Sequence, residues 1–329
     1  MGNVLTGFAI IGIIIALGAV LARVGVLGDH DRLMLSRLTF SVASPALLFD
    51  ILSKADLVDV FSVNLAATVI SVAGGLVVYT LVDLLLVRLR RAPAHTPSER
   101  LVSGMTGVYV NAGNLGLPVA TYVLGNPAYM APALLLQLLV LQPFTLTFLD
   151  VRRGRDRRGG AGHGAAEVEP VARGRGLLTI LSMPFRNPMT VGSAAGVAVS
   201  LAGLSLPMWL AEPISMVGDI AVPAMLLAFG ASLVLGPRFG ASGSTWRVGS
   251  AVMVKLLVQP LLAFVAATAL GGSEAIVFAA TVTASLPSAQ NLFIIASRYD
   301  AATSLVRDII LATTFGSLPV VFVASLLLH

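Results

Sequence analysis

The chain has 329 residues, of which 57% are hydrophobic and only 11% are charged, whereas about 25% of the residues in an average soluble domain are charged. The mean hydropathy of +0.91 likewise indicates a predominantly apolar chain. This composition excludes a water-soluble enzyme and predicts an all-α membrane protein that crosses the bilayer several times. The chain contains no cysteine, which excludes disulfides and Cys-based metal sites. We expect neither a metal nor any other cofactor.

Apolar segments long enough for a transmembrane helix of about 20 residues recur ten times along the chain. They lie at about 3–22, 32–53, 61–88, 100–124, 129–150, 184–203, 208–235, 245–269, 272–298 and 303–326. Residues 151–176 are rich in Gly and Arg and lack apolar periodicity, so we predict a flexible linker there. This linker separates a first five-helix repeat (1–150) from a second one (177–329).

Basic residues lie almost entirely on one side of the predicted membrane. That side carries the 151–176 linker together with Arg32 and Arg307, whereas the opposite side carries only Lys54. By the positive-inside rule the Arg-rich side is cytoplasmic, which places both termini outside and the protein in the cell (plasma or inner) membrane. Because topology explains the net charge of +5, we expect a lipid bilayer and no nucleic acid among the partners.

Internal spacing indicates a duplication. Pro45 and Pro223 are separated by nearly the same number of residues as Asn114 and Asn291. Since each half has an odd number of helices, the two halves are inverted relative to each other. Inverted repeats are typical of secondary transporters.

Two segments contain helix-breaking motifs near their middle: NAGNLGLP, ending at Pro118, and SLPSAQNLF, containing Pro287. A proline removes a hydrogen-bond donor and clashes with the preceding turn, so each segment should split into two half-helices. We expect the second halves to start at or near these prolines, with Gly116 and Ser285 as N-caps.

The residues before the prolines, Leu117 and Leu286, should leave the α region. Two half-helix N-termini at mid-membrane would suit an anion, especially a carboxylate, because their free N–H groups carry partial positive charge. The predicted substrate-binding residues are Asn111, Asn114, Pro118, Ser285, Pro287, Ser288, Gln290 and Asn291.

Four other polar residues within the spans are candidates for charge balance or coupling. Lys255 is either a counter-charge for an anionic substrate or a snorkelling side chain. Asp83 either carries a proton or pairs with an Arg at the cytoplasmic surface, and we favour the pairing. Asp219 is a further proton carrier candidate, and Gln137 either lines the cavity or bonds between helices.

The motifs NAGNLGLP, LPSAQNLFIIA, SPALLF and VPAMLLAFGASL resemble the auxin efflux carrier family, which includes bacterial malonate-type carriers. The resemblance covers essentially the whole chain and implies a fold similar to the bile acid sodium symporters. It implies a scaffold (about 3–53 and 184–235) and a moving transport domain (about 61–150 and 245–326). In that fold the fourth and ninth helices cross at their prolines beside the substrate. The residues carried over are Asn111, Asn114, Pro118, Pro287 and Asn291.

We therefore predict a secondary active transporter of an organic anion, such as malonate, malate or an auxin-like carboxylate, that works by an elevator motion. It would be a homodimer through its second and seventh helices, with proton, sodium or no coupling left open. A channel or a membrane receptor of the same fold is the alternative. An intramembrane protease built on Ser242 is disfavoured, because the four histidines lie in loops or at the chain end. Gly192 and Gly196 form a GxxxG pattern that favours close helix packing.

Overall fold

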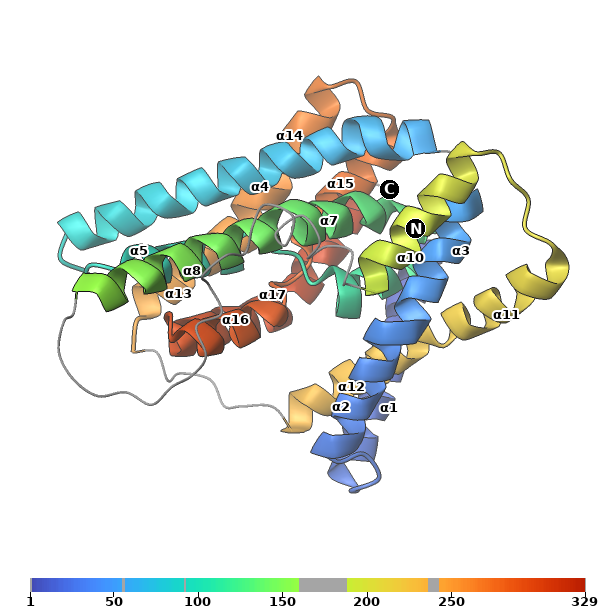
Figure 1. Cartoon of the computed structure of the whole chain (residues 1–329), viewed down its shortest axis with the longest axis horizontal. Helices are drawn as coiled ribbons and strands as arrows, with labels where there is room; N and C mark the ends of the chain where they lie inside the picture. The colour runs from blue at the N-terminus through green and yellow to red at the C-terminus, as the bar shows by residue number, and fades with distance from the viewer. Residues whose placement is uncertain (1, 55–56, 92, 160–187, 236–242, 329) are drawn as a thin grey trace.

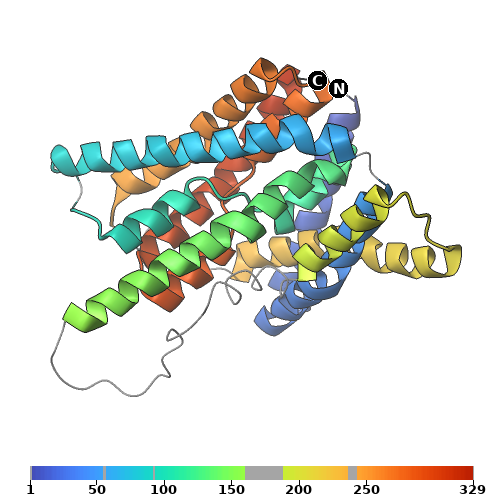
Figure 2. The same cartoon turned by 45° about the horizontal axis from the view of Figure 1, so that its top comes forward.

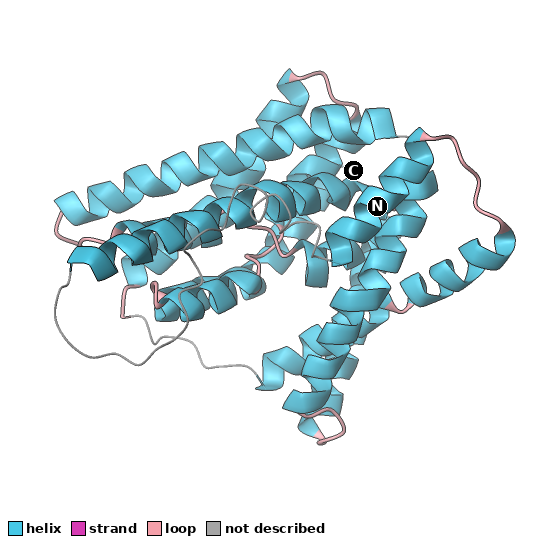
Figure 3. Cartoon of the chain, in the orientation of Figure 1, coloured by secondary structure: helices cyan, strands magenta, loops and turns pink. Residues whose placement is uncertain are grey.

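The computed structural model describes residues 2–54, 57–91, 93–159, 188–235 and 243–328. Within these ranges the chain consists of helices and connecting loops, and no strand occurs (Figure 3). Each of the ten apolar segments contains helix, which confirms the all-α prediction. The start of α1 and the end of α17 lie on the same side of the molecule (Figures 1 and 2).

Within the described ranges, six continuous helical runs are long and apolar enough to cross a membrane. They are Asp29–Lys54, Val63–Arg88, Pro127–Arg153, Met208–Leu235, Thr245–Ala269 and Thr303–Leu328. Three shorter apolar helices accompany them, at Ala9–Arg23, Pro188–Leu201 and Glu274–Ser285. The protein is therefore an integral membrane protein with several spans.

The helices pack in two groups. The first helix group is formed by helices from two parts of the chain, residues 2–54 and residues 188–235. Its members are α1 (Gly2–Arg23), α2 (Asp29–Leu38), η1 (Thr39–Ala43), α3 (Ser44–Lys54), α10 (Pro188–Leu201), α11 (Met208–Asp219) and α12 (Ala221–Leu235). Within it α1 packs against α12, and α3 packs against α10 and α11. These helices lie together at one end of the molecule (Figure 1).

The remaining elements form the second helix group, at the other end of the molecule (Figure 2). Its first part comprises α4 (Leu57–Arg88), α5 (Pro97–Thr106), η2 (Ala112–Gly116), α6 (Leu117–Tyr122), η3 (Pro127–Met130), α7 (Ala131–Leu136), η4 (Gln137–Leu141) and α8 (Gln142–Gly159). Its second part comprises α13 (Thr245–Met253), η6 (Val254–Val258), α14 (Gln259–Ala269), α15 (Glu274–Ser285), α16 (Asn291–Tyr299) and α17 (Thr303–Leu328). Here α14 packs against both α4 and α15.

Glycines allow close backbone approach inside the first group. A Cβ atom added at Gly192 would overlap the Pro45 backbone, and one at Gly196 would lie 2.7 Å from the Phe49 carbonyl oxygen. The GxxxG pattern therefore packs α10 onto α3, as predicted. Gly230 in α12 approaches the backbone of α1 in the same way, next to Ile15.

The largest apolar core joins the two groups. It combines Ile11 and Phe229 of the first group with Leu115, Leu117 and Val282 of the second. Contacts between α1 and α6, and between α12 and η2, also cross this boundary. The broken motif of the fourth segment is thus packed directly against the first group.

The predicted start of the linker, at residue 151, is wrong. Helix α8 continues to Gly159, because Arg is a good helix former and extends a helix that the apolar residues before it already stabilise. The rest of the linker and Ser242 lie outside the described residues.

Candidate functional site

Both predicted breaks interrupt their helices. In the fourth segment α5 ends at Thr106, residues 107–111 are not helical, and η2 and α6 follow. In the ninth segment α15 ends at Ser285 and α16 begins only at Asn291. The ninth-segment break contains Pro287, as predicted, whereas the fourth-segment break lies before Gly113, Gly116 and Pro118.

The details of the ninth-segment break differ from the prediction. Leu286 is extended, with φ −64° and ψ 155°, as expected before a proline. Ser285, however, is the last residue of α15 and not an N-cap, because its Oγ donates to the Thr281 carbonyl at 2.8 Å. The next helix starts after Pro287 at Asn291, since the Ser288 N–H is held by Thr313 Oγ1 at 3.1 Å instead of entering a helical turn.

At the fourth-segment break, helical structure resumes at Ala112 with η2 and continues into α6, so the second half starts before Pro118. Gly116 is helical, with φ −63° and ψ −52°, and the prediction that it is an N-cap is wrong. Leu117 is helical, so the prediction that it leaves the α region is wrong. Pro118 therefore lies inside a continuous helical run, directly after the π-helical turn η2.

The two breaks contact each other through polar groups. The Asn111 N–H donates to the Pro287 carbonyl at 2.8 Å, and Ser288 Oγ donates to the Thr106 carbonyl at 2.6 Å. Backbone groups that lose helical partners within a membrane must be satisfied by protein or by a wet cavity. Asn111, Pro287 and Ser288 are thereby brought together.

Lys255 and Gln259 tie both breaks to α14 and η6. Lys255 is wholly buried, and its Nζ donates to Gln259 Oε1 at 2.6 Å and to the Ala284 carbonyl at 2.8 Å. Gln259 Nε2 donates in turn to the Val108 carbonyl at 2.9 Å. The Lys255 amine therefore lies against the carboxyl end of α15, where helix carbonyls carry partial negative charge.

The snorkelling hypothesis for Lys255 is wrong, because no part of the side chain reaches the surface. Lys255 positions the backbone of the break. Gln259 was missed from the sequence, although it stands one helical turn after Lys255 and so on the same helix face.

A cavity of about 290 Å³ lies at the edge of the second break. It separates α12 of the first group from α16 and α17 of the second. Its polar and cationic lining residues are Arg32, Ser232, Gln290, Arg307 and Thr314, and its apolar ones are Phe229, Leu233, Phe293, Ile310, Leu311 and Phe315.

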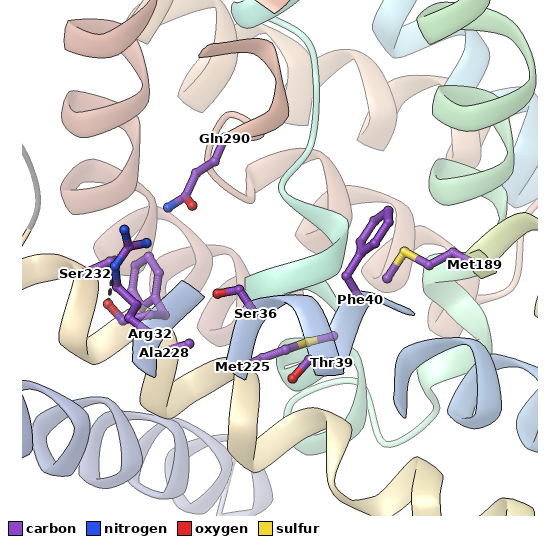
Figure 4. Close-up of a pocket in the computed structure, with 10 residues that line it drawn as sticks. Arg32, Ser36, Thr39, Phe40, Met189, Met225, Ala228, Ser232 and Gln290 are labelled. Atoms are coloured by element: carbon purple, nitrogen blue, oxygen red, sulfur yellow. Dashed lines mark hydrogen bonds between the residues drawn. The ribbon is translucent and has the colours of Figure 1, made fainter. Parts of the chain in front are cut away.

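A smaller cavity of about 30 Å³ shares four of these residues: Arg32, Phe229, Ser232 and Gln290. Figure 4 shows the Gln290 side chain extending from its helix end toward Arg32, on the opposite side of the cavity. An apolar pocket with a few converging polar groups is typical of a small-molecule site.

Gln290 is the predicted site residue that lines these two cavities. The positive-inside rule explains the side on which Arg32 and Arg307 lie, but it does not predict that both line one cavity. Their position within helices α2 and α17 does not distinguish them, because Arg88, Arg100 and Arg247 are also helical.

A third cavity, of about 490 Å³, lies along α14, α15 and α17. Thr281 and Ser285 contribute to a lining that is otherwise apolar. It suits hydrocarbon and not an anion, so Ser285 is separated from the cationic cavity.

The remaining predicted residues are dispersed. Asn114 is in η2 and its side chain is not described, whereas Asn291 is the first residue of α16 and is exposed. Asp219 is exposed at the end of α11. Gln137 is buried, and its carbonyl accepts from the hydroxyl of Tyr109, within the first break, at 2.9 Å.

Asp83 lies in a buried ionic cluster that joins α4, α5 and α13. Its carboxylate accepts from Arg247 Nε at 2.9 Å and from Arg100 Nε at 3.0 Å, and His95 Nδ1 lies 3.4 Å away. Pairing with Arg is confirmed, but a surface location is wrong because Asp83 is 0% exposed. Burial, and then the charge of Arg247, lowers the pKa of His95, so the imidazole is held neutral.

No group of three or more Asp, Glu or His side chains in the described ranges is arranged to hold a metal ion. Three features define the protein as a membrane transporter that accepts a polar solute. These are apolar helices of spanning length, two interrupted helices in contact, and a cationic cavity between the two helix groups.

Comparisons with known proteins agree with this class. The family described as "Membrane transport protein", the auxin efflux carrier family, matches residues 3–159 and 175–325. The chain belongs to this family, which confirms the resemblance seen in its motifs. It is a membrane transporter and not an enzyme.

Individual relatives are also named as transporters or carriers. A Rhizobium meliloti (strain 1021) protein named "Putative malonate transporter" is 29% identical over 94% of this chain and 90% of the relative. "Auxin efflux carrier component 1" of Arabidopsis thaliana is 24% identical over 46% of this chain and 25% of the relative. "Probable auxin efflux carrier component 1b" of Oryza sativa subsp. japonica is 28% identical over 46% and 28%, respectively.

Proposed function

We propose that the protein is a secondary active transporter of small organic anions, such as malonate, malate or an auxin-like carboxylate. The observation that carries this proposal is the cationic cavity between the two helix groups, at the edge of a helix break. An anion there would meet two guanidinium groups and the Gln290 amide. The name of the Rhizobium meliloti relative supports the same substrate class.

The proposed architecture has ten spans arranged as two inverted five-helix repeats, 1–150 and 177–329, joined by the end of α8 and the residues that follow Gly159. The broken fourth and ninth helices would cross at mid-membrane. The hydrogen bond between Asn111 and Pro287 supports this crossing. The location of both chain ends on one side supports an even number of spans (Figure 2).

The substrate would bind beside this crossing and reach the Gln290 end of the cavity. The contributing residues would be Asn111, Asn114, Pro118, Pro287, Ser288, Gln290 and Asn291, whereas Ser285 lines the separate apolar cavity. Gln137 and Lys255 would hold the surrounding backbone, through Tyr109 and Ala284, respectively.

Transport would proceed by an elevator motion. The first helix group would be the scaffold (about 3–53 and 184–235), and the second would be the moving domain (about 61–150 and 245–326). The internal packing of each group supports this division, since α1 packs on α12 and α14 packs on α4. The boundary where α6 meets α1 would be the sliding surface.

The scaffold would dimerise through the second and seventh helices. Large apolar side chains exposed on α11, Met208, Trp209 and Met216, support a surface covered by lipid or by a second copy. The protein would lie in the plasma or inner membrane of the cell. Both termini would be outside, and the end of α8 with the residues after Gly159 would be in the cytoplasm. Coupling to protons or sodium would involve an acidic residue such as Asp219.

Uptake of radiolabelled malonate into proteoliposomes tests the proposal. We expect saturable uptake, and flux under separately imposed proton and sodium gradients identifies the coupling ion. Asn114→Ala and Asn291→Ala should each abolish uptake in a folded protein. Asn126→Ser, in the loop after α6, is the matched control and should retain it.

Normal uptake by both Asn→Ala variants would contradict the site. Conductance far above carrier turnover would instead favour a channel, and binding without flux would favour a receptor.

A further inference from the structure

Two arginines that are distant in the sequence line one cavity. Arg32 belongs to α2 in the first helix group and Arg307 to α17 in the second. Their side chains are 25% and 23% exposed, respectively, so each side chain is largely buried.

Both guanidinium groups keep buried donors without a protein acceptor. Among the described residues, Nε of Arg32 and both Nε and Nη2 of Arg307 are buried and have no hydrogen-bond partner. Buried charged donors that remain unsatisfied are costly, and native proteins rarely keep them without a purpose.

The nearest carboxylates do not satisfy these donors. Arg32 Nη2 donates to Oδ1 of Asp29 at 3.4 Å, a long hydrogen bond to a side chain that is 66% exposed, and Arg32 Nε keeps no partner. Arg307 Nη2 lies 3.6 Å from Asp308 Oδ1, beyond hydrogen-bond distance. Each arginine therefore retains donors for a further acceptor in the cavity.

We propose that Arg32 and Arg307 bind the two carboxylates of a small dicarboxylate, one from each helix group. This inference rests on the proposed function and assigns its substrate class to two residues outside the helix breaks. Guanidinium groups bind carboxylates through two parallel hydrogen bonds. A cavity of about 290 Å³ limits the ligand to a small molecule.

The placement of the two cations has a mechanical consequence. A dicarboxylate held by both arginines bridges the two helix groups and stabilises them in contact. A monocarboxylate neutralises one arginine and leaves the other without an acceptor. The pair therefore determines specificity for two negative charges.

Calorimetric titration of the full-length protein in detergent, with malonate and with propionate as probes, tests this assignment. We expect malonate to bind more tightly than propionate. Arg32→Gln and Arg307→Gln should each weaken malonate binding roughly 10- to 100-fold, as expected for a lost charge-assisted hydrogen bond, and remove the preference over propionate. Arg32→Lys should restore part of the affinity because it keeps the charge.

Arg37→Gln is the matched control, since Arg37 is exposed on the same helix and does not line the cavity. Its affinity should equal that of the unmodified protein, and thermal unfolding should show that every variant is folded. Failure of the unmodified protein to prefer malonate, or unchanged malonate affinity in either Arg→Gln variant, overturns the assignment.

Uptake assays separate this inference from the proposed function. Malonate uptake together with arginine-independent binding would refute the site and leave the transport function intact. Arginine-dependent binding without any uptake would support the site and refute transport.

Discussion

Replacement of Asp83 by Asn tests whether this residue is structural or carries a coupling proton. Asp83 is wholly buried and accepts hydrogen bonds from Arg247 and Arg100. The neutral amide would leave the Arg247 guanidinium, which is only 3% exposed, without a compensating charge. His95 cannot compensate for this loss, because it carries no negative charge.

The expected loss of stability follows from these distances. At 2.9 Å and an effective dielectric constant of about 20, the gross attraction between Asp83 and Arg247 is roughly 6 kcal/mol. Part of it is offset by the desolvation of both ions. Removal of one member of a buried pair costs about 3–5 kcal/mol. Arg100 adds less, since its side chain is 29% exposed.

Thermal unfolding in detergent, followed by tryptophan fluorescence at one scan rate, measures this loss. At about 2 °C per kcal/mol, Asp83→Asn should lower Tm by roughly 6–10 °C. Lys54→Gln is the control, because Lys54 pairs with Asp50 at 2.6 Å but is 62% exposed. Its Tm should change by less than about 2 °C.

A double variant sharpens the test. Adding Arg247→Gln to Asp83→Asn should recover part of the lost Tm, because it removes the uncompensated charge. An Asp83→Asn protein that keeps its Tm but loses proton-driven uptake would refute the structural role and identify Asp83 as a proton carrier.

Three further predictions follow from packing, burial and hydrogen bonding. Gly192→Ala should destabilise the protein by about 1–3 kcal/mol, because its Cβ overlaps the α3 backbone. Gly12→Ala is the control, because a Cβ at Gly12 meets no neighbouring atom, and it should not destabilise the protein. Equal Tm values for the two variants would contradict the packing argument. Burial holds the pKa of His95 below 6.5, so the unfolded chain binds more protons as the pH falls through this value. Stability should therefore decrease below pH 6.5, and a His95→Gln protein with an equally steep decrease would show that another group is responsible. Gln259→Leu should reduce malonate uptake in a folded protein, because Lys255 and the segment after α5 lose a shared partner. Gln259→Glu keeps the acceptor for Lys255 and should retain more uptake; the reverse order would exclude this role.

Features that depend only on residues adjacent in the sequence were predictable. Hydropathy over about 20 residues located the helices, because a segment that crosses the hydrocarbon core of the bilayer must be apolar over that length. Pro287 located the ninth-segment break for an equally local reason, whereas the fourth-segment break, at residues 107–111, precedes Pro118. The exact helix starts were less predictable, since the position of Asn291 at the start of α16 depends on a hydrogen bond from Ser288 to Thr313 in another helix.

The amino-acid order alone determined the membrane environment, the helical segments, the two breaks and the family, because each is encoded in a short run of residues. Only the tertiary structure brought Arg32 and Arg307 to one cavity, placed Lys255 against the end of α15 and buried Asp83 between two arginines. A charge within an apolar segment has the same appearance whether it faces the surface, a break or a cavity. The packing of distant helices decides among these environments, and with them the chemistry of each side chain.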